Sequence, residues 1–167
     1  MVAAQPICLP EPGQSYDNVA SVVTGWGTTT SDPKDRKLSA ILQQANLTTI
    51  TNSQCKDTKW LKLYSNANKT LAELLKIASK RMVTDNMICA VNPKGGICHG
   101  DSGGPLITLD KKGKYVQIGI ASWNDAKMQR DTVRNKTIIL KQCILENPDV
   151  FSRVTAGLQW IKQNIRK

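Results

Sequence analysis

Residues 97 to 105 of the chain read ICHGDSGGP and place a serine, Ser102, in a glycine-rich turn. Such a turn can display a hydroxyl group toward a substrate, because glycine permits the sharp backbone conformations of a tight turn. A serine hydroxyl becomes an effective nucleophile only when a neighbouring base takes its proton. The single histidine, His99, lies three residues before Ser102. The sequence thus offers a candidate nucleophile without an obvious base.

The size and charge of the chain narrow its possible functions. Its 167 residues are enough for one domain with a hydrophobic core. The formal net charge is +10, but Lys and Arg are scattered, so we expect a solvated basic surface and no nucleic-acid partner. A polyanion-binding module is an alternative that rests on charge alone. No apolar run approaches the ~18 residues of a transmembrane helix, so we expect no membrane partner. We also expect no cofactor and no metal.

Short apolar runs broken by Gly, Ser, Thr and Asn predict most of the secondary structure. Such runs are typical of strands, and their spacing, with few helices between them, indicates an all-β barrel or sandwich. The predicted strands span residues 20–27, 41–50, 103–109, 115–123 and 149–154.

Two segments instead show helical spacing of apolar residues. Thr70 and Glu73 form a capping-box signature at the start of one, which predicts a short inserted helix up to Met82. Leu158 and Ile161 share one face of the other, a predicted helix at the C-terminus that docks on the barrel.

Cysteines and glycosylation sequons indicate an extracellular protein. The chain has five cysteines, and N-x-[ST] sequons occur at Asn46, Asn68 and Asn135. The N-terminal residues lack the basic start and apolar block of a signal peptide. We therefore expect a piece of a longer secreted glycoprotein.

Three stretches together resemble the C-terminal half of the trypsin/chymotrypsin family of serine proteases. They are CLP...VTGWG, MICA...CHGDSGGPL and IASW...PDVFSRVTAGLQWIKQNI, in this order. The resemblance implies the second, C-terminal antiparallel Greek-key β-barrel of that fold. It divides the chain into a linker at 1–20, the barrel at 21–156 and a C-terminal helix at 157–167.

The same resemblance assigns roles to the residues of the turn. Ser102 would be the nucleophile, and the backbone N–H groups of Gly100 and Ser102 would form the oxyanion hole. Asp101 would form an ion pair with a new N-terminal ammonium created by activation cleavage. The implied substrate is a protein or peptide.

In this family the histidine base and its aspartate come from a first barrel, which the sequence does not include. His99 would lie at the pocket rim and would not replace the base. We therefore expect a truncated endopeptidase that is inactive alone, with the missing N-terminal barrel as its partner through the cleft face and Cys8. The alternative is a non-catalytic homologue that acts as a binding module.

The resemblance also implies the disulfides and the pocket. It pairs Cys55 with Cys89 and Cys98 with Cys143, and it leaves Cys8 unpaired for a cysteine elsewhere; a free thiol is the alternative. It also names seven substrate-binding residues: Gly96, Ile97, His99, Ser122, Trp123, Asn124 and Asp149.

Asp149 leaves two interpretations of the pocket open. Its carboxylate could select Lys or Arg side chains of the substrate. Alternatively, Asn124 and Asp149 could fill the pocket and make it unproductive. Two insertions, between Cys55 and Cys89 and within residues 124–143, depart from the family pattern, and the sequence does not decide whether they tune substrate choice or bind a partner.

Overall fold

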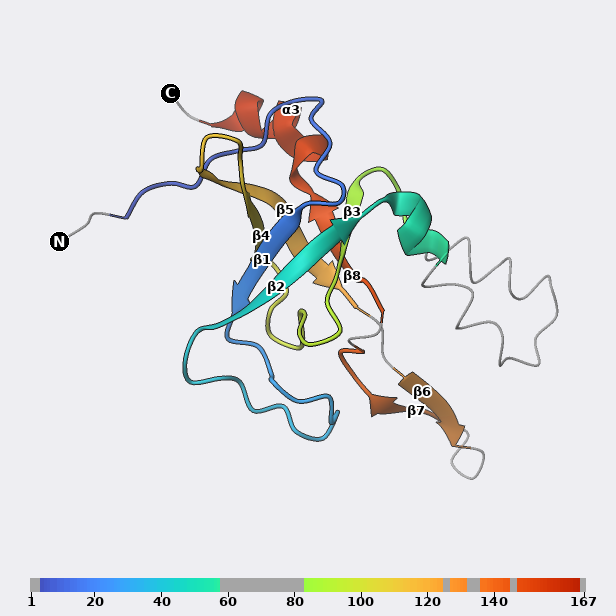
Figure 1. Cartoon of the computed structure of the whole chain (residues 1–167). Coiled ribbons are helices and arrows are strands. Elements are labelled where there is room, and N and C mark those ends of the chain that lie inside the picture. Colours follow the sequence, from blue (N-terminus) through green and yellow to red (C-terminus); the bar gives the residue numbers. More distant parts are fainter. Residues whose placement is uncertain (1–3, 58–82, 125–126, 132–135, 145–146, 166–167) are drawn as a thin grey trace.

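The computed structural model describes residues 4–57, 83–124, 127–131, 136–144 and 147–165. Six strands form a closed barrel in the order β1-β2-β3-β8-β5-β4, and every neighbouring pair is antiparallel (Figure 1). The structure confirms the predicted all-β barrel. The barrel strands are β1 (Ala20–Gly25), β2 (Gln43–Ile50), β3 (Met87–Val91), β4 (Pro105–Leu109), β5 (Tyr115–Trp123) and β8 (Asp149–Arg153).

The barrel core forms because apolar side chains alternate along the strands and point inward. In β5, Val116 and Ile118 are buried while Tyr115 is exposed. The centre is closely packed, since a Cβ atom on Gly119 would lie 3.0 Å from the Cβ of Phe151. Closure removes the free edges of the sheet and holds the loops at its ends in fixed positions.

The C-terminal helix α3 (Val154–Asn164) follows β8 directly and packs on β5. Its buried residues are Val154 and Leu158, which lie four positions apart on one face. The expected range was 157–167, and the helix begins three residues earlier. Its first residue, Val154, is buried.

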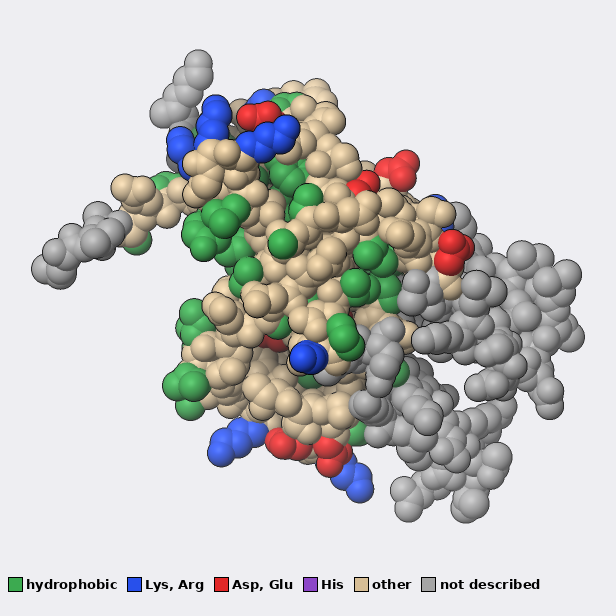
Figure 2. All heavy atoms as spheres, in the orientation of Figure 1, with side chains coloured by type: hydrophobic (Ala, Val, Ile, Leu, Met, Phe, Trp, Pro, Cys, Tyr) green, Lys and Arg blue, Asp and Glu red, His purple; other side chains and the backbone are tan. Residues whose placement is uncertain are grey.

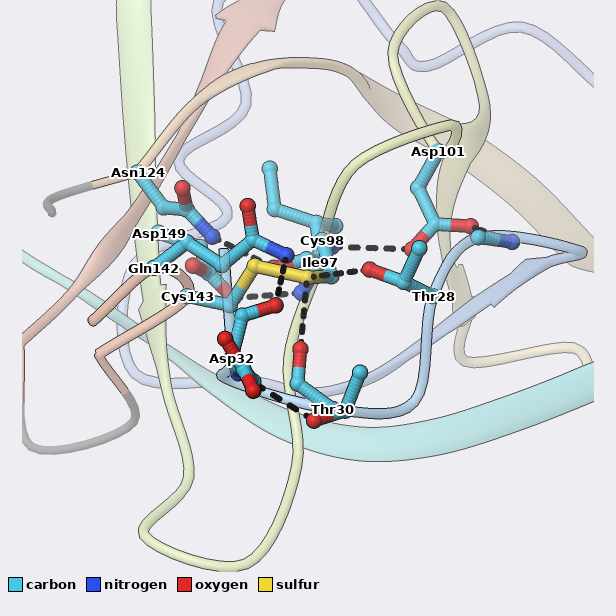
Figure 3. Close-up of a disulfide and its surroundings, with 11 residues drawn as sticks. Thr28, Thr30, Asp32, Ile97, Cys98, Asp101, Asn124, Gln142, Cys143 and Asp149 are labelled. Carbon is cyan, nitrogen blue, oxygen red and sulfur yellow. Dashed lines mark hydrogen bonds between the residues drawn. A yellow bond between two sulfur atoms is a disulfide. The ribbon is translucent and has the colours of Figure 1, made fainter. Parts of the chain in front are cut away.

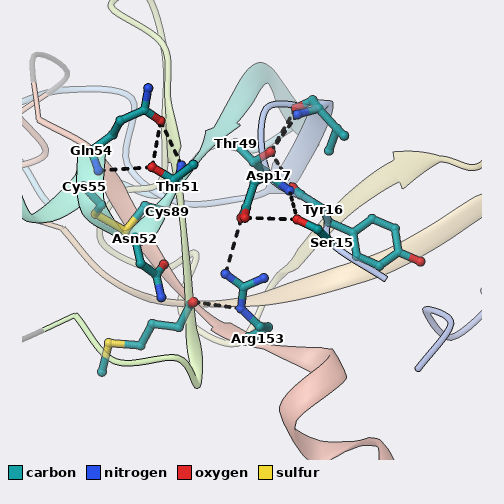
Figure 4. A network of polar contacts seen from close by, with 12 residues as sticks. Ser15, Tyr16, Asp17, Thr49, Thr51, Asn52, Gln54, Cys55, Cys89 and Arg153 are labelled. Carbon is teal, nitrogen blue, oxygen red and sulfur yellow. Dashed lines mark hydrogen bonds and ion pairs between the residues drawn. A yellow bond between two sulfur atoms is a disulfide. The ribbon is translucent and has the colours of Figure 1, made fainter. Parts of the chain in front are cut away.

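A second helix begins at residue 52 and is described as far as residue 57. It begins with a capping box, in which the Gln54 N–H donates to Thr51 Oγ1 at 3.2 Å and the Thr51 N–H donates to Gln54 Oε1 at 3.0 Å (Figure 4). The helix that Thr70 and Glu73 predict lies outside the described residues.

The segment before β1 lies against the barrel. The Cys8 N–H donates to the Tyr115 carbonyl at 3.3 Å, and the Gln117 N–H donates to the Cys8 carbonyl at 3.0 Å. Further along, Asp17 pairs with Arg153 at 3.5 Å, and Arg153 Nε also donates to the Met87 carbonyl at 3.0 Å (Figure 4). These contacts fasten the expected linker at two places.

The insertion after β5 contains a two-stranded antiparallel sheet of β6 (Lys127–Asp131) and β7 (Lys136–Lys141). We call this sheet the ribbon. It extends away from the barrel (Figure 1). Apolar periodicity did not predict these strands. Within the described part of the chain, no helix has both the length and the apolar character needed to cross a membrane.

Candidate active site

Ser102 lies in the turn that leads into β4, and it is exposed. The turn is held against β5 by two backbone hydrogen bonds: the Gly103 N–H donates to the Ala121 carbonyl at 2.9 Å, and the Ala121 N–H donates to the Gly104 carbonyl at 2.8 Å. The barrel therefore presents the Ser102 hydroxyl from a fixed backbone.

Gly100 satisfies a conformational and a steric requirement. Its φ angle is +99°, which side chains disfavour. A Cβ atom there would lie 2.8 Å from Cδ2 of Leu38 and 3.2 Å from Cα of Gly27. Among the described residues, the N–H groups of Gly100 and Ser102 donate to no protein acceptor. Both N–H groups are thus available to an external oxygen atom.

The Asp101 carboxylate supports the turn from beneath. Its Oδ1 accepts the Gly27 N–H at 2.8 Å, and its Oδ2 accepts the Cys98 N–H at 2.9 Å (Figure 3). Asp101 also lines a cavity of about 330 Å³ between the ends of β1 and β2 and residues 94–98. The carboxylate therefore lies beside a space that could admit a cationic group.

Thr28 fixes the other side of the turn. Its N–H donates to the His99 carbonyl at 2.8 Å, and its Oγ1 lies 2.9 Å from Sγ of Cys98. Because that sulfur belongs to the disulfide with Cys143, the Thr28 hydroxyl is the donor. The His99 side chain is exposed, and within the described chain no hydrogen bond joins it to Ser102.

The segments of the expected pocket are joined through Ile97. The Ile97 N–H donates to Oδ2 of Asp149 at 2.9 Å, and Asn124 Nδ2 donates to the Ile97 carbonyl (Figure 3). Asp149 is 6% exposed, and a Cβ atom on Gly96 would overlap its carboxylate. The structure therefore brings Gly96, Ile97, Asn124 and Asp149 together.

The remaining wall of the expected pocket is the end of β5. Ala121 pairs with Phe151 and Trp123 pairs with Val150, so Ser122 is an extra residue in a β-bulge. Ser122 is exposed, and Trp123 packs against the cluster that contains Val150. The bulge interrupts the regular pairing of β5 with β8 at Ser122, where the expected pocket wall begins.

Both disulfides join the cysteines that the resemblance pairs, Cys55–Cys89 and Cys98–Cys143, and Cys8 is free and exposed. Asn46 is exposed on β2. The sequons at Asn68 and Asn135 lie outside the described residues.

Sequence reasoning missed the residues that support the turn from the β1 side: Gly25, Gly27, Thr28 and Leu38. A signal was present in the two glycines that flank Trp26. A Cβ atom at either glycine would overlap the Asp101 carboxylate. Their absent side chains make room for that carboxylate.

The family is established by comparison with known proteins. The barrel presents an exposed serine beside two backbone N–H groups that have no acceptor among the described residues. The family model described as trypsin matches residues 2–161, and the chain belongs to the trypsin family.

Similar proteins are considerably longer than this chain. It is 35% identical to transmembrane protease serine 11C of Mus musculus over 158 residues, which are 92% of this chain and 28% of that protein. It is 30% identical to clotting factor G beta subunit of Tachypleus tridentatus over 166 residues, which are 95% of this chain and 44% of that protein. The chain thus spans less than half of these relatives.

Proposed function

We propose that the chain is the nucleophile-bearing barrel of a secreted serine endopeptidase. The proposal depends on two observations. Ser102 is exposed, and the backbone N–H groups of Gly100 and Ser102 have no protein acceptor among the described residues. In acyl transfer, the Ser102 Oγ attacks the substrate carbonyl carbon, and these N–H groups bind the oxygen as it becomes negative. One such donor contributes roughly 3–4 kcal/mol to transition-state stabilisation.

The base that accepts the Ser102 proton comes from a second barrel. His99 is the sole histidine in the sequence, and its exposed side chain forms no hydrogen bond to Ser102 within the described chain. We therefore expect the 167 residues alone to hydrolyse peptides poorly or not at all. An N-terminal ammonium entering the cavity beside Asp101 would pair with that carboxylate and stabilise the turn.

An apolar surface beside the turn supports a docked second barrel. Its exposed side chains belong to the loop between β1 and β2: Trp26 (56%), Leu38 (53%), Ile41 (70%) and Leu42 (53%). Figure 2 shows hydrophobic side chains along the edge of the molecule where that loop lies. Leu38 also borders Gly100, so a docked barrel would meet the cleft side of the turn. The free thiol of Cys8 would link the same partner covalently.

The two disulfides support the proposal that the protein is secreted. The disulfides Cys55–Cys89 and Cys98–Cys143 form and persist in oxidising surroundings. The same apolar surface also favours a second candidate function, that of a non-catalytic homologue which binds a partner through this face.

A fluorophosphonate probe tests the assignment of Ser102 and of the external base. The wild-type chain and Ser102→Ala would be incubated with the probe, with and without a high concentration of imidazole as a substitute base. We expect no stoichiometric labelling without imidazole, and imidazole-dependent labelling of the wild type only. Stoichiometric labelling without imidazole would show that the chain supplies its own base. No difference from Ser102→Ala under either condition would favour the binding module.

A further inference from the structure

The turn between β4 and β5 presents three lysines from a closely hydrogen-bonded backbone. The Asp110 N–H donates to the Lys114 carbonyl at 2.9 Å, and the Gly113 N–H donates to the Asp110 carbonyl at 3.0 Å. Asp110 Oδ1 accepts the N–H groups of Lys112 and Lys114, both at 2.8 Å. We call residues 110–114 the lysine turn. Because its backbone is already held in place, the turn loses little conformational freedom when its side chains bind a partner.

The lysine side chains of this turn are available to a partner. Lys111, Lys112 and Lys114 are exposed, and among the described residues none of these side chains forms an ion pair or a hydrogen bond. Three lysines against the single aspartate, Asp110, give the turn a net charge of +2. The turn is therefore a local concentration of positive charge on a fixed support.

Further positive charge gathers at the same end of the barrel. The helix α3 packs on β5, and its last turn carries the exposed Lys162. The lysine turn and α3 lie at the same end of the barrel (Figure 1), and Lys and Arg side chains gather there with an acidic side chain among them (Figure 2). Short clusters of basic residues such as this one are typical of surfaces that bind polyanions.

We propose that the lysine turn binds a sulfated polysaccharide of the heparin class. Sulfate groups are ionised oxygen acceptors, and each lysine ammonium offers them three donors and a full charge. The compact ammonium on a flexible stem can follow sulfate groups whose spacing along the sugar chain varies. The fixed backbone of the turn directs several such side chains toward one polysaccharide chain.

The choice of this polyanion rests on the proposed secretion of the protein. Leu109 and Tyr115 pair across β4 and β5 beside the turn and are 54% and 56% exposed, so an anionic membrane is a competing occupant. Anionic lipid is concentrated in the cytoplasmic leaflet, which a secreted protein does not meet, and membrane-binding clusters usually hold about four to eight basic residues. The lysine turn has three, which favours the polysaccharide.

The lysine turn lies at the opposite end of β4 from the turn that carries Ser102. The strand runs from Pro105, just after the serine turn, to Leu109, just before the lysine turn. A polysaccharide bound at the lysine turn would therefore anchor the protein and leave Ser102 accessible.

Fluorescence anisotropy of a short labelled heparin oligosaccharide tests the proposal on the full chain at about 0.15 M salt. The turn variant changes all three lysines to glutamine: Lys111→Gln, Lys112→Gln and Lys114→Gln. Glutamine keeps the backbone N–H groups that Asp110 accepts, and thermal unfolding would verify that the variant folds. We expect about tenfold weaker binding, the factor that three weak exposed ion pairs together provide. Changing the same three residues to arginine keeps the charge and should preserve binding.

A matched control separates the lysine turn from the net charge of the chain. Three exposed basic residues of the loop between β1 and β2 would be changed to glutamine: Lys34, Arg36 and Lys37. This control variant loses as much charge as the turn variant. We expect its affinity to fall by less than about threefold, because salt screens charges that are distant from the bound chain. Equal losses in the two variants would overturn the proposal.

Two competition measurements identify the partner. Chemically desulfated heparin should displace the labelled oligosaccharide poorly, and displacement as effective as that by heparin would contradict recognition of sulfate. Vesicles of phosphatidylserine and phosphatidylcholine test the competing occupant. Binding to these vesicles that depends on the lysine turn, without binding to heparin, would overturn the proposal in favour of a membrane.

These measurements are independent of acyl transfer, because equilibrium binding of a polyanion requires neither the Ser102 hydroxyl nor an external base. A failure of fluorophosphonate labelling would therefore count against the proposed catalysis alone. A failure of the turn variant to weaken heparin binding would count against the lysine turn alone.

Discussion

Gly27 donates its backbone N–H to Oδ1 of Asp101 at 2.8 Å, across 74 positions of sequence. The absent side chain of Gly27 is what allows this approach, since a Cβ atom there would overlap the carboxylate. The loop that follows β1 thereby holds the residue that immediately precedes Ser102.

Gly27→Ala should destabilise the chain because the added methyl group forces the Asp101 carboxylate out of place. We expect a loss of about 1–3 kcal/mol in the free energy of unfolding, the usual cost of overpacking. Chemical denaturation would measure it. Gly157→Ala is the matched control: nothing lies within 4 Å of its Cβ position in α3, so it should stabilise by about 0.5–1 kcal/mol. Equal effects of the two variants would contradict the role of Gly27.

The Cys55–Cys89 disulfide should account for a large part of the stability. It joins residues 34 positions apart, and both cysteines are fully buried beside Val83 and Val150. In the chain-entropy treatment, replacing both cysteines by alanine should lower the free energy of unfolding by about 4 kcal/mol. Thermal and urea unfolding would measure the loss.

Cys8→Ser is the control for the disulfide variant. Its thiol is exposed and, within the described chain, belongs to no disulfide, so this change should leave the stability unaltered. A stability loss for Cys8→Ser as large as that of the double variant would mean that the effect does not come from closing the loop.

The turn between β4 and β5 should respond to acid. The Lys114 N–H donates to Oδ1 of Asp110 at 2.8 Å and is the main cause that lowers the pKa of Asp110, with the Lys112 N–H acting in the same direction. Since the folded pKa is depressed, the contribution of Asp110 is present above its unfolded pKa and is lost as the pH falls through the folded value.

NMR titration of the Asp110 carboxyl carbon, in the native chain and in urea, checks this expectation. The native midpoint should be the lower of the two. Asp110→Asn removes the titrating group and serves as the control for changes in neighbouring signals. Coincident midpoints in the native and unfolded chains would show that the turn hydrogen bonds do not favour the ionised form.

Asn46 should carry a glycan when the chain passes through a secretory pathway. Asn46 and Thr48 are both exposed on β2 while Leu47 between them is buried, so the strand presents the two sequon residues on its outer face. Asn46→Gln should remove one glycan, visible as a mass decrease before glycosidase treatment and not after it. Thr48→Ala, which breaks the sequon but keeps Asn46, should have the same effect; an unchanged mass would mean that Asn46 is unoccupied.

The barrel could be predicted from the sequence because five of its six strands carry local signals; β3 (Met87–Val91) was not predicted. Alternating burial in β5 and the apolar runs of β1 and β4 are properties of short segments. The ribbon could not be predicted in this way, because β6 (Lys127–Asp131) is largely polar and, among the described strands, pairs only with β7. A strand with a largely polar sequence lacks the apolar alternation on which such a prediction depends.

The candidate site was predictable only where its motif is contiguous. The turn from Cys98 to Pro105 could be identified at once, whereas Thr28 and Leu38 reach it from another part of the chain. Those contacts depend on how β1 pairs with β4 and β2, which a single sequence does not reveal. The hydrogen bonds from Ile97 to Asn124 and Asp149 were missed for the same reason, although both side chains had been named as pocket residues.

The way in which the insertion after β5 is fastened has a consequence for engineering. Asn124 at its start donates a hydrogen bond to the Ile97 carbonyl, and Cys143 at its end forms a disulfide with Cys98, so adjacent residues hold both ends. Doubling the length of a loop with fixed ends costs only about 0.6 kcal/mol. Exchanging residues 125–142 for a foreign hairpin is therefore expected to cost the barrel little stability.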